Sequence, residues 1–159
     1  MVGIGILLFP VLKKHSEQMA VGYISFRILE TISCIVAAIF PLSVLALSLE
    51  SQAQTKEISN LKILARTILT ARVDIAGILI PLFFSLGAII FYIFLYQTKL
   101  LPRFISVWGL IGIALILLLN LLNIKSSAGM ILALPIILNE IFLGIWLIVK
   151  GFRPVAIHA

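Results

Sequence analysis

Residues Ala20–Leu49 read AVGYISFRILETISCIVAAIFPLSVLALSL, a stretch whose only charged side chains are Arg27 and Glu30. About 20 apolar residues are enough for a helix to cross the roughly 30 Å hydrocarbon core of a bilayer. Four more apolar runs surround this one: a short run at Met1–Leu12 and longer ones at Val73–Tyr96, Phe104–Ile124 and Ala128–Val149. The sequence therefore predicts an all-α, polytopic transmembrane helix bundle with four full spans and a partial N-terminal helix.

The composition supports a single integral membrane domain over residues 1–159. Apolar residues make up 62% of the chain and charged residues 11%, whereas a soluble domain is about half apolar and a quarter charged. The net charge of +6 does not indicate nucleic-acid binding, because the basic residues lie in short connections between the apolar runs. Such placement is typical of loops that contact anionic lipid, so the bilayer is the expected partner.

The first apolar run is too short to span. As a helix, Met1–Leu12 reaches only about 18 Å, and it has no charged n-region of the kind that begins a signal peptide. Pro10 and Lys13 resemble the end of a spanning helix, so we expect that this chain begins within a longer helix. The alternative is a half-inserted helix held by its neighbours.

Basic residues favour one orientation. If each long run crosses once, the connections 13–19 and 97–103 and the tail from Lys150 share one side, with six Lys or Arg residues and one acid. Short loops rich in Lys and Arg stay in the cytoplasm. All five Tyr and Trp residues also fall toward that side. We therefore expect a bacterial plasma-membrane protein whose C-terminus is cytoplasmic.

The longest connection, residues 50–72, is expected to be an outer loop. Within it, residues 61–71 place Leu61, Leu64 and Ile68 on one helical face and Lys62 and Arg66 on another. Two interpretations stay open: an amphipathic helix in the outer interface, or an extension of the helix that begins at Val73.

The candidate site is a buried polar cluster of Arg27, Glu30, Asn139 and Glu140. Arg27 and Glu30 are three residues apart, which places them on one helix face. Glu140 is expected at a similar depth from the same side of the membrane. A charge at this depth costs several kcal/mol and is functional by default, as a proton relay, a ligand contact or a switch. The alternative is an ion pair that specifies helix packing, with Asn139 forming an interhelical amide bond.

Other polar and small residues indicate packing. Asn120 and Asn123 share a face and are expected to lie between helices. Close helix contact is expected at several glycines: Gly77, Gly87, Gly109, Gly112 and Gly144.

Recognisable catalytic chemistry is absent from the sequence. The only histidines are His15 and His158, and Cys34 is the only cysteine. These residues cannot make a zinc or haem site, and no phosphate-binding glycine loop or nucleophile motif occurs. We therefore expect no cofactor and no metal, and a function without catalysis is favoured over an enzymatic one.

Two dense stretches resemble a known family. They are LPRFISVWGLIG at Leu101–Gly112, and Leu138–Glu140 together with WLIVKGF at Trp146–Phe152. With Gly22-Tyr23, Arg27 and Glu30, they resemble the bacterial membrane proteins called domain of unknown function 4386. The resemblance implies a bacterial plasma-membrane location and a six-helix parent that is longer at the N-terminus. It implies no activity.

Three functions compete on this evidence. The first is a non-enzymatic membrane protein that binds a partner, either a second copy or another membrane protein, or senses a component of the bilayer. The second is a small oligomeric, proton-coupled carrier that uses Arg27, Glu30 and Glu140. The third is an intramembrane enzyme with Glu140 as acid or base, and it ranks last because no nucleophile or metal set accompanies the carboxylate.

Overall fold

The computed structural model describes residues 2–51, 58–122 and 127–151, and all regular structure in them is helical. The helices are α1 (Val2–Lys13), α2 (Glu17–Ser51), α3 (Ile58–Thr98), α4 (Arg103–Leu121) and α5 (Ser127–Lys150). Four of them are long and apolar enough to cross a membrane, and α1 is a shorter apolar helix. The chain is therefore an all-α bundle with four candidate spans, as the sequence predicts.

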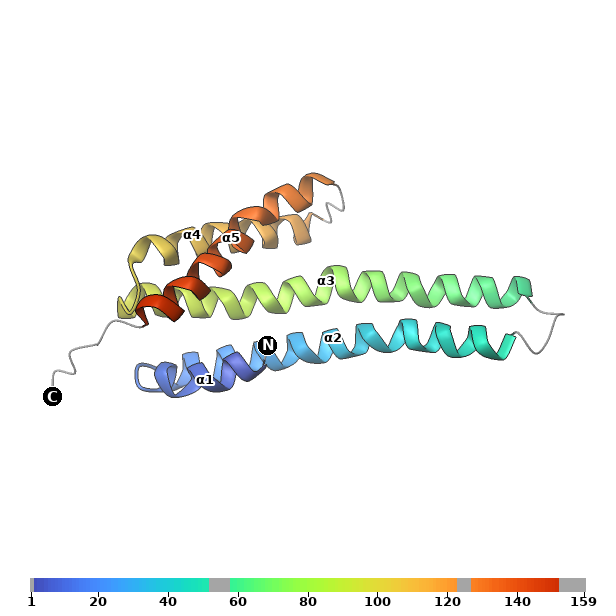
Figure 1. Cartoon of the computed structure of the whole chain (residues 1–159), viewed down its shortest axis with the longest axis horizontal. Helices are drawn as coiled ribbons and strands as arrows, with labels where there is room; N and C mark the ends of the chain where they lie inside the picture. Colours follow the sequence, from blue (N-terminus) through green and yellow to red (C-terminus); the bar gives the residue numbers. More distant parts are fainter. Residues whose placement is uncertain (1, 52–57, 123–126, 152–159) are drawn as a thin grey trace.

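The longest helices, α2 and α3, form an antiparallel hairpin (Figure 1). Helix α3 begins at Ile58, well before the expected start at Val73. The segment 61–71 is thus an extension of α3, and residues 58–72 are not a loop. The helix continues because its apolar period runs unbroken into the span and neither Pro nor Gly occurs between Ile58 and Gly77. Residues 52–57 of the expected loop lie outside the described residues.

Neighbouring helices pack in chain order, α1 on α2, α2 on α3, α3 on α4 and α4 on α5. The best-buried side chains gather where α1 meets α2 and α3 meets α4. They include Leu12, Tyr23, Phe94, Leu95, Leu101 and Ile105. Helices α1, α3 and α5 end and α4 begins at this end of the bundle (Figure 1). We call it the basic end, because the helix bounds place Lys13, Lys99, Arg103 and Lys150 here, and we call the opposite end the far end.

Cations at the basic end rest on aromatic rings. The Lys150 Nζ lies 4.4 Å from the Trp146 ring centroid, and the Arg103 Cζ lies 5.4 Å from that of Tyr96. Amphipathic rings and long basic side chains of this kind occupy the headgroup level of a bilayer. The basic end is therefore built as a membrane interface.

Two glycines allow α4 to approach its neighbours closely. A Cβ added to Gly109 would overlap the ring of Tyr92 on α3, and one added to Gly112 would lie 2.9 Å from the Cβ of Ile136 on α5. The expectation of close contact is confirmed at these positions. It is wrong for Gly77 and Gly144, where an added Cβ meets nothing within 4 Å, because the space that a side chain would take at these two positions is open.

A proline in α3 explains one contact between helices. Pro81 has no N–H, so the carbonyl of Gly77, four residues earlier, lacks its helical donor. The side-chain Nδ2 of Asn120 on α4 donates to this carbonyl at 2.8 Å. The expected interhelical role of Asn120 is confirmed, while Asn123 lies outside the described residues.

The contact between Asn120 and Gly77 shows how far the hairpin of α2 and α3 extends beyond the other helices. Asn120 is close to the far end of α4, which has 19 residues and is about 28 Å long. Beyond Gly77, α3 continues back to Ile58, about 28 Å further. Figure 1 shows the hairpin of α2 and α3 projecting past α4 and α5 at the far end.

Candidate functional site

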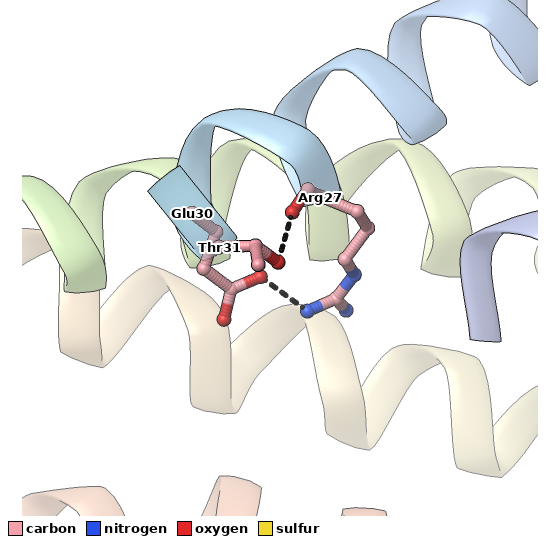
Figure 2. Close-up of polar contacts among 3 residues, drawn as sticks. All are labelled: Arg27, Glu30 and Thr31. Atoms are coloured by element: carbon pink, nitrogen blue, oxygen red, sulfur yellow. Dashed lines mark hydrogen bonds and ion pairs between the residues drawn. The ribbon is translucent and has the colours of Figure 1, made fainter. Parts of the chain in front are cut away.

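An ion pair is buried in the basic-end half of α2. The Arg27 Nη1 donates to the Glu30 Oε2 at 2.8 Å, and the side chains are only 11% and 1% exposed. Figure 2 shows the two side chains one turn apart on α2, with the guanidinium of Arg27 next to the carboxylate of Glu30. The Thr31 hydroxyl donates to the Arg27 carbonyl at 2.8 Å, so a second side chain of this turn bonds within α2. The sequence prediction that Arg27 and Glu30 share a face agrees with this geometry.

Aromatic rings from two helices hold the guanidinium in place. The Arg27 Cζ lies 5.3 Å from the ring centroid of Tyr23, one turn earlier on α2, and 5.4 Å from that of Phe84 on α3. Cation–π contacts are strongest when desolvated. Gly5 of α1 and Gly87 of α3 border the arginine, because a Cβ on Gly5 would lie in van der Waals contact with the Arg27 Cβ at 3.6 Å and one on Gly87 would lie 3.9 Å from its Nε.

The pair leaves hydrogen-bonding capacity unused. Among the described residues, the Arg27 Nε and the Glu30 Oε1 are buried without a hydrogen-bond partner, as is the Ser85 hydroxyl. A buried donor or acceptor without a partner costs about 1–3 kcal/mol. The arginine thus keeps a free donor, and the carboxylate a free acceptor, at the depth of the ion pair.

Asn139 serves a different contact. It is fully buried, and its Nδ2 donates to the Ile105 carbonyl of α4 at 2.9 Å. This is the interhelical amide bond expected from the sequence. Asn139 therefore fastens α5 to α4 and has no contact with the ion pair of α2.

Glu140 is exposed, although the sequence predicts that it is buried. It lies on the surface of α5, because the preceding Asn139 occupies the face toward α4 and successive helical residues point about 100° apart. Glu140 nevertheless lies within electrostatic range of both Arg27 and Glu30. The expected cluster thus consists of a buried pair, a nearby carboxylate and a separate packing amide.

A pocket joins Arg27 to Glu140. Its volume is about 490 Å³, and residues of α1, α2, α3 and α5 line it, which is within the 300–1,000 Å³ range of ligand sites. On α5 the lining extends from Glu140 to Gly151, a rise of about 16 Å. Since Gly151 is at the basic end, the pocket runs from the interface to the ion pair.

Most of the pocket wall is apolar or aromatic. Among the described residues, Arg27 and Glu140 are the charged ones in its lining, and the rings of Tyr23, Phe84, Phe91 and Tyr92 also belong to the wall. Tyr23 could be expected from its place one turn before Arg27. Phe84 and Phe91 could not, because their approach depends on how α3 packs against α2. Within the described residues, no group of His, Cys, Asp and Glu could hold a metal ion.

Comparison with known families finds one match that extends over almost the whole chain. The model of one protein family, described as domain of unknown function (DUF4386), matches residues 1–151. The chain belongs to the DUF4386 family. The match includes Arg27, Glu30, Asn139 and Glu140 and every helix described above. Searches of curated proteins and of solved structures found no significant match. The protein is thus an integral membrane protein of a family without an assigned function.

Proposed function

We propose that this DUF4386 protein is a non-enzymatic membrane protein that binds an amphipathic molecule from the bilayer. The observation that carries the proposal is the pocket that connects the basic end to Arg27 and Glu140. It is apolar along its length and charged at its deep end, which is the arrangement that orients an amphipathic ligand.

The chemistry of the deep end defines the ligand. Arg27 contributes positive charge and hydrogen-bond donors to the pocket wall, so a ligand whose polar end accepts hydrogen bonds suits this end. The wall between Glu140 and Gly151 spans about 16 Å along α5, which accommodates one acyl chain. A single-chain lipid with an uncharged acceptor group, such as a fatty acid in its protonated form, meets both requirements without adding a third negative charge beside Glu30 and Glu140.

Filling the pocket without changing its charges tests the proposal. Gly144 lines the pocket and an added Cβ meets nothing there, so a leucine at this position can occupy pocket space. Gly77 on α3 has equal room outside the pocket and supplies the matched control, Gly77→Leu. Native mass spectrometry with added oleic acid should show the adduct on wild type and Gly77→Leu and its loss in Gly144→Leu. Equal adducts on all three proteins would refute the pocket as the site.

A carrier function is the second candidate, and the charge count favours it. The site holds one cation, Arg27, and two carboxylates, Glu30 and Glu140, so one further positive charge balances it. A proton on Glu140 or a bound cation can supply that charge. Proteoliposomes with a pH-sensitive dye inside test this alternative. Carriage predicts a proton flux that Glu140→Gln abolishes, whereas a sensor predicts no flux in either protein.

We place the basic end on the cytoplasmic side of a bacterial plasma membrane, with the C-terminus inside. The concentration of Lys and Arg in its short connections supports this orientation. A C-terminal fusion to green fluorescent protein should fluoresce, and a fusion to alkaline phosphatase should be inactive. The opposite pair of results would invert the orientation.

A further inference from the structure

One face of α2 carries an uninterrupted stripe of exposed residues. Successive members are alternately four and three residues apart, which is the a/d spacing of a coiled coil. We call this stripe the α2 seam, and it consists of Val21, Ser25, Ile28, Ile32, Ile35, Ile39, Leu42, Ala46 and Leu49. Its Val, Ile and Leu side chains are each 42–64% exposed, so no helix in the described part of the chain covers them.

Lipid alone cannot cover the whole seam. From Val21 to Leu49 the helix rises about 42 Å, which fits a 30 Å hydrocarbon core only at a tilt of about 45°. Spanning helices tilt by 0–40°. The excess lies at the far end, where a single-pass helix of normal tilt leaves the hydrocarbon.

The packing of the hairpin shows which residues are in excess. Gly87 of α3 lies beside Phe26 of α2, so in the antiparallel hairpin Gly77 faces the neighbourhood of Val36. Gly77 contacts the far end of α4 through Asn120. Seam residues from Ile39 onward therefore stand beyond the ends of the shorter spans. Apolar side chains outside the hydrocarbon are stabilised when contact with protein removes them from water.

We propose that the α2 seam binds the α2 seam of a second copy of this chain. Two copies inserted with one orientation present their α2 helices in parallel, and a parallel pair brings each seam residue opposite its equivalent. The positions that flank the seam are uncharged through Ile39 and Leu42, among them Thr31, Ala38, Leu29, Val36 and Ser43. Like charges therefore do not oppose self-pairing.

The size of the seam is appropriate for a stable pair. Its exposed apolar side chains present on the order of 700 Å², close to the roughly 800 Å² that each partner gives to a standard interface. The small residues Ser25 and Ala46 let the two backbones approach. The strict seven-residue period predicts a left-handed supercoil. Pairing uses a face that the pocket does not include, so this inference is independent of the proposed function.

Cysteine cross-linking in native membranes tests the pairing. In a Cys34→Ala background, single substitutions Ile35→Cys, Ile39→Cys and Leu42→Cys place thiols on the seam. Equivalent positions of a parallel pair approach the Cα separation of a disulfide, about 4.4–6.8 Å. Each seam variant should give a disulfide-linked band at twice the monomer mass on oxidation. Leu69→Cys, an exposed position of α3 near the level of Leu42, is the control and should stay monomeric.

Two outcomes overturn the pairing. One is equal cross-linking of the seam variants and Leu69→Cys, which indicates random collision. The other is the absence of a dimer band in all three seam variants although each is present in the membrane fraction. Co-purification of two differently tagged wild-type copies provides the second measurement, because it requires no substitution, and failure to co-purify also refutes the pair.

Discussion

Removing the carboxylate of Glu30 leaves the Arg27 guanidinium buried without its counter-charge. Glu30 is 1% exposed and bonds the arginine at 2.8 Å. Breaking a buried pair by removing one partner costs about 3–5 kcal/mol, whereas replacing both partners by apolar residues of similar volume is often neutral. We therefore expect Glu30→Leu to destabilise the protein by about 3–5 kcal/mol. The double variant Arg27→Met with Glu30→Leu should lie within about 1 kcal/mol of wild type.

Unfolding in mixed micelles with a rising fraction of sodium dodecyl sulfate measures these differences. Glu30→Gln is the conservative control, because it keeps an acceptor for Arg27 and removes only the charge, so its cost should be intermediate. Oleic acid binding separates structure from function, since the double variant should fold but lose the adduct. A Glu30→Leu protein as stable as wild type would show that the membrane or water, not Glu30, compensates Arg27.

Three further substitutions test helix packing by the same unfolding measurement. Gly109→Ala should cost about 1–3 kcal/mol, because its methyl group overlaps the Tyr92 ring, and an unchanged stability would contradict this close approach. Asn120→Leu should cost about 1–3 kcal/mol, because it leaves the carbonyl freed by Pro81 without a donor. In a Pro81→Ala background the restored backbone N–H donates to the Gly77 carbonyl, so the cost of Asn120→Leu should largely disappear. An undiminished cost would show that Asn120 does not replace the donor that Pro81 lacks. Asn139→Leu should also cost about 1–3 kcal/mol through the α4–α5 contact while leaving oleic acid binding in place, and loss of the adduct would assign Asn139 to the site.

The spans could be predicted because length and apolar content determine whether a helix can cross a bilayer. The start of α3 could not, because Lys62 and Arg66 on one face fit either an interfacial helix or the projecting end of a longer one. Only the packing of α3 along α2 distinguishes the two.

The candidate site was predictable where it depends on one helix. Three-residue spacing is sufficient to pair Arg27 with Glu30. The position of Glu140 was not predictable, because it depends on which face of α5 packs on α4, and Asn139 fixes that face. The pocket was not predictable either, since four helices contribute to its wall.

Pro81 interrupts the backbone hydrogen bonding of α3, so the helix bends more easily there than elsewhere. The projecting half of α3 can therefore tilt relative to the rest of the helix. Its pivot is next to the amide of Asn120, and the arm from Gly77 to Ile58 is about 28 Å long. Tilting this arm by about 10° at the proline moves its tip by about 5 Å. Small rearrangements among the spans at this joint are therefore amplified several-fold at the tip of the hairpin, on the opposite side of the membrane from the pocket mouth.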